Sequence, residues 1–139
     1  MKLTNTQSMK RKAGMTLLEL TVVILVLLSL ISILFIGARA WKKGSDRAGC
    51  IMNIRNVQQA IRSYGNMNGL NPGDTIPSSG TLTSVLIGAN SFMANAPTCP
   101  GNGSYTGMAG TTIPTVGTVA LTCNFSDGPA HTPSNTGDW

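Results

Sequence analysis

The stretch Lys10–Leu30 reads KRKAGMTLLELTVVILVLLSL and opens the segment that decides the fold of this chain. From Leu17 to Ile36 all residues are strongly apolar, with four exceptions: Glu19, Thr21, Ser29 and Ser32. A run of about 20 apolar residues is long enough to cross a hydrocarbon core about 30 Å thick. Glu19 is the charged residue of this run, and a carboxylate there is costly enough that we expect it to have a function.

Charge is distributed unevenly along the chain. The formal net charge of +5 comes from ten basic and five acidic residues, and all ten basic residues lie between Lys2 and Arg62. Residues 63–139 carry acidic groups alone: Asp74, Asp127 and Asp138. A nucleic-acid-binding domain gathers Lys and Arg on one folded face, so we expect no nucleic-acid partner. Basic residues flank the apolar run on both sides, so charge by itself leaves the membrane orientation open.

The apolar run continues into a second helical pattern. A narrow apolar stripe is formed by residues spaced alternately four and three apart: Cys50, Ile54, Val57, Ile61 and Tyr64. This spacing indicates an amphipathic helix. Because the first proline is Pro72, we expect one nearly continuous helix from about Met15 to about Tyr64. Its second half needs another part of the chain to cover the stripe.

Residues from Gly65 onward are rich in Gly, Thr, Ser, Asn and Pro. The spacing of Leu82, Val85 and Leu86 predicts a short helix, with three candidates for its N-cap: Ser78, Ser79 and Thr81. Two runs rich in β-forming residues, 103–109 and 118–125, predict a small antiparallel sheet. Such a sheet is marginal alone and should pack on the stripe. The expected fold class is α+β.

Two explanations of the apolar run are conventional. One is a secretory signal peptide cut after Ala40, because Ala38 and Ala40 form an A-x-A pattern; the long run, its carboxylate and Arg39 inside the cleavage motif argue against it. The other is an uncleaved anchor that carries a small periplasmic binding domain and does not polymerise. In that explanation the carboxylate of Glu19 costs free energy in the membrane and has no function.

The third explanation uses the order of features, since RKAG precedes the apolar run. RKAG followed by MTLLELTVVILVLLSLISI resembles the prepilin signal of type IV pilins and type II secretion pseudopilins, and IMNIRNVQQAIRSY (51–64) is similar to pilin stem helices. In that family a membrane aspartyl peptidase cuts after a glycine on the cytoplasmic side. The resemblance implies cleavage after Gly14 and N-methylation of Met15, although phenylalanine is commonest at the new terminus.

The resemblance also implies a domain organisation and a role for Glu19. Residues 1–14 would be the leader, 15–38 the membrane and polymerisation helix, 39–65 the amphipathic stem and 66–139 a small C-terminal domain. Cleavage would create an ammonium group on Met15, and pairing with Glu19 of another subunit would remove most of the cost of both charges. The alternative is that Glu19 reaches the membrane interface and has no partner.

The function implied is a structural subunit of a pilus-like fibre or secretion pseudopilus in the bacterial inner membrane, with its C-terminal domain in the periplasm. The implied partners are copies of itself, other pilins or pseudopilins, the prepilin peptidase, the assembly platform and the lipid bilayer. An enzyme is not expected. The chain has one His, no paired carboxylates at useful spacing and no apparent cluster of zinc ligands.

Three cysteines, Cys50, Cys99 and Cys123, allow three pairings. We expect a Cys99–Cys123 disulfide that links the C-terminal domain, because both residues lie in the turn-rich region and oxidising compartments permit disulfides. Closing a loop of about 25 residues would stabilise it by about 3 to 4 kcal/mol. Cys50 is expected to be a buried thiol, with pairing to a distal cysteine or another subunit left open. CPGNGSY, a second Cys and a later His also resemble a subset of prepilin-like proteins.

No cofactor is expected, with calcium as a weak possibility. Asp127 and Asp138 could supply carboxylates, but their spacing matches no EF-hand-like loop. His131, between Pro129 and Pro133, is expected to be an exposed loop residue.

Overall fold

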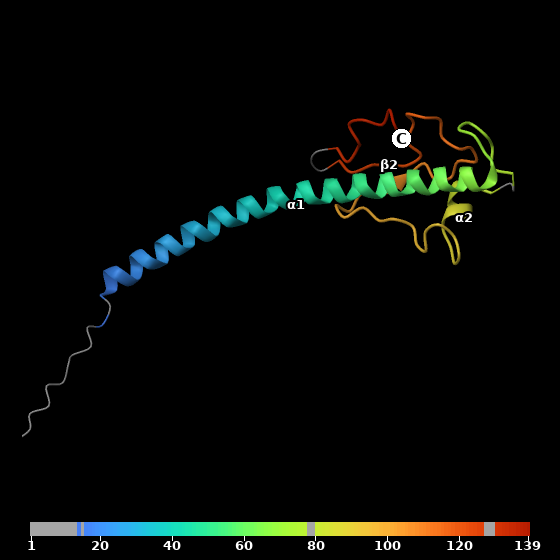
Figure 1. Ribbon diagram of the computed structural model, residues 1–139. Helices are drawn as coiled ribbons and strands as arrows, with labels where there is room; N and C mark the ends of the chain where they lie inside the picture. The colour runs from blue at the N-terminus through green and yellow to red at the C-terminus, as the bar shows by residue number, and fades with distance from the viewer. Residues whose placement is uncertain (1–13, 15, 78–79, 127–129) are drawn as a thin grey trace, which may run out of the picture. The chain divides into compact units, whose positions relative to one another are not determined.

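The structure, a computed structural model, describes residues 14, 16–77, 80–126 and 130–139. Its elements in chain order are α1 (Leu17–Asn68), α2 (Leu82–Leu86), β1 (Tyr105–Thr106) and β2 (Thr122–Cys123) (Figure 1). One long helix and a small antiparallel sheet confirm the α+β class. The chain forms two compact units, Met1–Ala38 and Arg39–Trp139, and α1 contributes residues to both.

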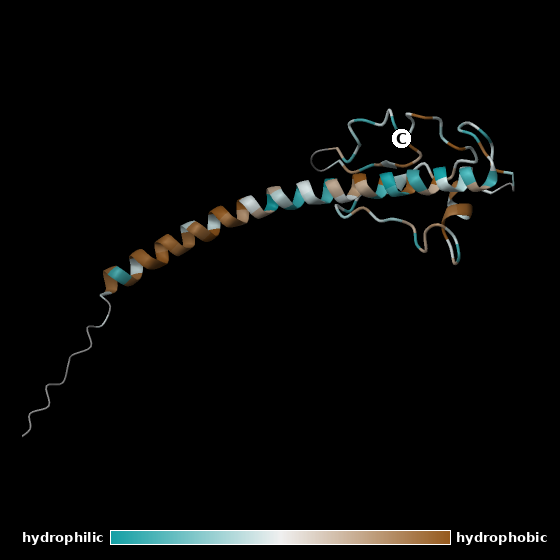
Figure 2. Ribbon diagram, viewed as in Figure 1, coloured by the Kyte–Doolittle hydropathy of each residue, from teal (hydrophilic) through white to brown (hydrophobic). Residues whose placement is uncertain are grey.

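The first unit contains the apolar part of α1. Its large side chains are extensively exposed, from 45% for Leu20 to 82% for Leu17, and they form the continuous hydrophobic run in Figure 2. Its hydroxyl groups bond back to the helix's own carbonyls: Thr21 to Leu18, Ser29 to Val26 and Ser32 to Leu28. Hydroxyls satisfied in this way need no water. By length and composition this segment is a candidate membrane span or signal anchor.

The second unit is organised around the rest of α1, residues 39–68, called the stem below. Cys50, Ile54, Val57 and Ile61 are each at most 1% exposed, which confirms the predicted stripe. The helix ends at Asn68, later than predicted, and the Leu70 N–H donates back to the Gly65 carbonyl at 2.9 Å where the chain leaves it. A left-handed Gly69 (φ +65°) then terminates it.

Turn-rich segments cover the stripe. The buried apolar side chains that they supply are Ile76, Leu82, Leu86, Cys99, Ile113 and Leu121. The short helix α2 contributes two of them, and Thr81 is its N-cap. The Thr81 hydroxyl accepts a bond from the Ser84 N–H, and the Ser84 hydroxyl accepts one from the Thr81 N–H. This reciprocal capping box confirms the predicted helix and selects Thr81 among the three candidate caps.

The sheet is shorter than the β-forming runs suggested. β1 and β2 pair antiparallel over two residues each, with Tyr105 opposite Cys123. Gly107 follows β1 with φ +116°, and its backbone approaches Ala120 so closely that a Cβ would collide with the Ala120 carbonyl. A left-handed residue at that point ends the regular ladder.

Where the ladder ends, a buried side-chain amide forms hydrogen bonds to the backbone. Gln58, on the stem, is 3% exposed. Its Nε2 donates to the Thr118 carbonyl at 3.0 Å, and its Oε1 accepts from the Ala120 N–H at 3.1 Å. One side chain therefore satisfies two backbone groups of the segment that leads into β2, and fixes that segment on the helix.

Candidate functional site

Four segments of the second unit bring three sulfurs and one imidazole together. Cys50 comes from the stem, Cys99 from the loop after α2, Cys123 from β2 and His131 from the tail (residues 130–139). Their potential ligand atoms all lie within 4.8 Å of one another. Cys50, Cys99 and His131 are buried, and Cys123 is partly buried. We call this group the Cys3His cluster.

The predicted Cys99–Cys123 disulfide is wrong. The two Sγ atoms lie 3.6 Å apart, whereas a disulfide bond is about 2.05 Å long. All three cysteines are free thiols. The prediction considered two cysteines of the same turn-rich region, and it could not account for a third sulfur and an imidazole packed against the same pair.

The expectation of an exposed His131 is also wrong. Its side chain is 1% exposed, and its Nδ1 lies 3.4 Å from the Cys99 Sγ and 4.0 Å from the Cys123 Sγ. The Phe125 ring stacks on the imidazole with centroids 4.0 Å apart and an interplanar angle of 14°. Arg47 on the stem donates through Nε to the carbonyl of Ala130 at 3.0 Å. These contacts fix the ring and the backbone that carries it.

Two glycines allow the loop 99–103 to wrap the sulfurs. A Cβ at Gly103 would lie 2.8 Å from the Cys123 Sγ and 3.3 Å from the Cys99 Sγ. A Cβ at Gly101 would lie 2.9 Å from His131 Cε1 and 3.2 Å from the Phe125 ring. Both positions therefore exclude a side chain, and the reason is close approach to the cluster.

The surroundings shift the pKa values of Cys50 and Cys99 in opposite directions. Burial raises the pKa of the Cys50 thiol to about 12, and its two cysteine neighbours add to the effect. Burial also opposes ionisation of Cys99, but the backbone N–H groups of Gly101 and Gly103 outweigh it, so the pKa of this thiol lies below its usual value. The neighbouring Cys123 and Cys50 thiols also lower the pKa of Cys99.

Tyr105 and Asn53 hold the backbone beside Cys50. Burial raises the pKa of Tyr105, so its hydroxyl stays protonated. That hydroxyl donates to the Cys50 carbonyl at 3.5 Å and accepts from Asn53 Nδ2 at 3.2 Å. Asn53 also donates to the Thr98 carbonyl, which precedes Cys99. The stem and the loop therefore position their cysteines through a shared polar network.

The Cys3His cluster could bind a metal ion. The expectation that the chain lacks a cluster of metal ligands is therefore wrong. It was missed because the four ligands follow no short spacing rule. Calcium is not supported, since this ion takes oxygen ligands. Asp138 is exposed in the tail, and Asp127 lies outside the described residues.

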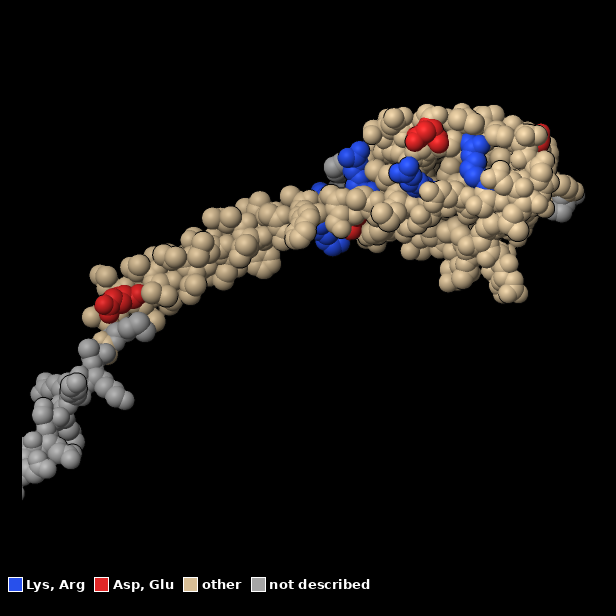
Figure 3. Space-filling model, viewed as in Figure 1, with Lys and Arg blue, Asp and Glu red and all other residues tan. Residues whose placement is uncertain are grey.

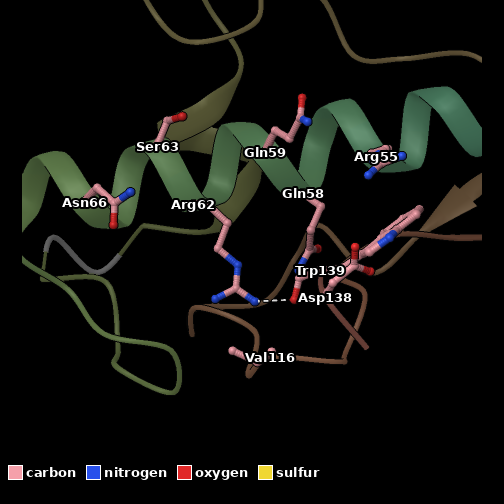
Figure 4. A pocket seen from close by; sticks show the side chains of 9 residues that line it. All are labelled: Arg55, Gln58, Gln59, Arg62, Ser63, Asn66, Val116, Asp138 and Trp139. Atoms are coloured by element: carbon pink, nitrogen blue, oxygen red, sulfur yellow. Dashed lines mark hydrogen bonds between the residues drawn. The ribbon is translucent and has the colours of Figure 1, made fainter. Parts of the chain in front are cut away.

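Apart from the cluster, a hollow of about 590 Å³ lies where the tail meets the stem (Figure 4). The two arginines that line this hollow both contact Trp139. Arg62 Nη2 donates to the main-chain oxygen of Trp139 at 2.6 Å, and the Arg55 guanidinium lies 5.6 Å from the centre of the Trp139 ring. Asp138 lies at the rim. These contacts explain how the tail is anchored, which in turn supports the position of His131.

The basic residues at the start of the stem lie beside the loop of the cluster. Arg39, Lys42 and Lys43 line a shallow hollow together with Gly101 and Phe125. Lys42 forms an ion pair with Asp46 at 3.4 Å. Figure 3 shows Lys and Arg side chains gathered on the stem. On the visible face of the apolar part of α1, the charged side chain in view is a carboxylate. Anionic sulfurs in this loop would lie in a favourable field.

At the other end of α1, Thr16 and Glu19 form a capping box. The Glu19 carboxylate accepts from the Thr16 N–H at 2.8 Å and from its hydroxyl at 3.0 Å, and the Glu19 N–H donates to the Thr16 hydroxyl at 3.3 Å. The pattern T-x-x-E in the sequence could have predicted this arrangement. Gly14 is exposed with open space around it. Met15 lies outside the described residues.

Comparisons with protein-family models, with curated proteins and with solved structures found no match.

Proposed function

We propose that this chain is a structural subunit of a type IV pilus-like fibre or a type II secretion pseudopilus. One observation carries the proposal: the apolar part of α1 is exposed on all sides, it begins three residues after the exposed Gly14, and the charged residue of its first turn is a carboxylate, Glu19. An anchor needs the apolar surface alone. The carboxylate and the glycine gain a function when the chain is cut after Gly14 and polymerises.

In this proposal the leader 1–14 is removed on the cytoplasmic side, and the amine of Met15 is freed and methylated. The apolar part of α1 holds the subunit in the bacterial inner membrane, with the second unit in the periplasm, until an assembly platform moves it into the fibre. Its exposed large side chains then pack against neighbouring subunits. These contacts replace contacts with lipid rather than with water, so they stabilise the fibre through close van der Waals packing.

Glu19 has a local partner, and the proposal must accommodate it. Both bonds from Thr16 end on Oε2 of the carboxylate, and neither uses Oε1. A carboxylate offers about four acceptor positions, so Oε1 can accept the ammonium group of Met15 of an adjacent subunit while Oε2 caps the helix. The capping box then orients the carboxylate for the contact between subunits.

The mass of the intact protein, purified from its native membrane, tests the proposal. We expect the chain to lack residues 1–14 and to carry one additional methyl group on Met15. A mass equal to that of the full chain would indicate an uncleaved membrane anchor. A mass that corresponds to cleavage after Ala40 would indicate a secreted domain, and either result would refute the fibre subunit.

A further inference from the structure

We propose that Cys50, Cys99, Cys123 and His131 together bind one Zn²⁺ ion as a closed, four-coordinate structural site. The inference is independent of the fibre proposal, because it rests on the second unit alone. It concerns three side chains for which the sequence predicted a disulfide or a free thiol, and one that it placed in solvent.

The distances fit tetrahedral coordination. With Zn–S of about 2.3 Å and Zn–N of about 2.0 Å, two sulfur ligands of a tetrahedron lie about 3.8 Å apart, and a sulfur and a nitrogen about 3.5 Å apart. The Cys99 and Cys123 sulfurs are 3.6 Å apart, and His131 Nδ1 lies 3.4 and 4.0 Å from them. The whole set spans at most 4.8 Å, so small movements would bring every ligand to bonding distance.

The donor set selects the metal. Three thiolates and one imidazole are soft or borderline ligands, which suit Zn²⁺ and exclude the oxygen-seeking Ca²⁺ and Mg²⁺. Four protein ligands leave no open position for water or substrate, and this is the composition of structural rather than catalytic zinc sites.

The surroundings are those of a built metal site. The loop 99–103 closes tightly over the sulfurs, since a Cβ at Gly103 would lie 2.8 Å from the Cys123 Sγ and 3.3 Å from the Cys99 Sγ. Phe125 and Arg47 orient the His131 ring and its backbone. Zn²⁺ with three thiolates has a net charge of −1, and Arg39, Lys42 and Lys43 flank the adjacent loop.

Such a site would cross-link parts of the chain that lie far apart in the sequence. One ion links the stem, the loop 99–103, β2 and the tail, in a unit whose sheet has two residues per strand. Binding transfers no electrons: the thiols release their protons to solvent as the Zn–S bonds form. Because unfolded chains lack the preformed site, the binding free energy becomes folding free energy.

The competing explanation is that three thiols and an imidazole simply fill the core. The untagged full chain in detergent distinguishes the two when it is purified without chelator or added thiol. We expect one zinc per chain by elemental analysis. After exchange with Co²⁺ we expect thiolate-to-cobalt charge-transfer bands and the intense visible bands of tetrahedral cobalt.

Substitutions separate ligation from packing. Cys50→Ala should weaken zinc binding by at least about 100-fold, because loss of a residue that merely orients a ligand already costs 10- to 100-fold. The matched control is Val57→Ala, which removes a buried side chain from the same stripe without removing a ligand, and it should keep one zinc per chain.

Three results would overturn the proposal. The first is a wild-type protein that holds no stoichiometric zinc after dialysis against zinc-containing buffer. The second is bound Co²⁺ without thiolate charge-transfer bands, a measurement on the wild type that does not depend on how the variants fold. The third is equal loss of zinc from the Cys50→Ala and Val57→Ala proteins.

Discussion

The carboxylate of Glu19 has a local role and a proposed one, and a substitution can separate them. As a cap it accepts two bonds from Thr16, and this role does not require a negative charge, since glutamine serves in capping boxes as well. As the partner of a free amine in an apolar phase, it must be ionised. The two roles therefore differ in their dependence on charge.

Glu19→Gln should keep the helix start and abolish assembly. We expect normal removal of the leader and normal amounts of membrane-inserted subunit, but at least a tenfold loss of fibres in shearing assays. The control is Thr16→Val, which keeps the charge and removes the hydroxyl partner, at a cost of about 0.5 to 2 kcal/mol for the cap. Fibres from the Gln variant at wild-type level would disprove the ion-pair role.

Gly103 is constrained by the cluster rather than by its backbone conformation, because its Cβ position lies 2.8 Å from the Cys123 Sγ. Gly103→Ala should therefore lower zinc affinity by about 10- to 100-fold, as for other changes beside metal ligands. Gly110→Ala is the control, since the nearest atom to its added Cβ would be 3.7 Å away. Competition with a colorimetric chelator measures both, and equal affinities would contradict the predicted contact.

Packing of the stem depends on one polar side chain among apolar ones. Gln58 satisfies the Thr118 carbonyl and the Ala120 N–H, and both groups would lose their partner in Gln58→Leu. Both bonds are partly buried, and such a bond contributes about 0.5 to 1.5 kcal/mol, so we expect the free energy of unfolding to fall by about 1 to 3 kcal/mol. Urea titration followed by circular dichroism measures the change.

The adjacent Gln59 supplies the control for that substitution. It is exposed, so Gln59→Leu makes the same chemical change on the same helix without unpairing a buried group. Its free energy of unfolding should stay within about 0.5 kcal/mol of the wild type. A Gln58→Leu protein as stable as the Gln59→Leu protein would show that the amide does not hold the segment before β2.

The short elements of the second unit show which structural features local sequence patterns can predict. The spacing of the stripe and that of Leu82, Val85 and Leu86 predicted both helices, since each depends on residues three or four positions apart. The β-forming runs overpredicted the strands. The chain leaves the ladder at Gly107 for a close contact with Ala120, and no pattern within either run contains that contact.

The compact unit Arg39–Trp139 contains every buried core residue among those the structure describes, and all four residues of the cluster. A chain that begins at Arg39 should therefore be soluble without detergent, bind one zinc and melt cooperatively. Calorimetry and elemental analysis on that fragment test this. A fragment that aggregates or holds no zinc, while the full chain in detergent binds it, would show that residues 1–38 contribute to folding of the second unit.

Removal of the ion should lower the stability of the same fragment. Ligand binding at 100 times the dissociation constant stabilises by about 2.7 kcal/mol, so a strong chelator should reduce the melting temperature by several degrees. Added zinc should reverse the change, whereas added calcium should not. A melting temperature that is insensitive to the chelator would argue against a structural role.

Local sequence specified the apolar helix with its carboxylate, the amphipathic stem and the short helix α2. These follow from side-chain periodicity, because the helical repeat places residues three and four apart on one face. The Cys3His cluster did not follow from any spacing. Its members lie on four segments far apart in the chain, and packing against the stem brings them within 4.8 Å. Cys99 and Cys123 therefore looked like a disulfide pair until folding placed Cys50 and His131 beside them.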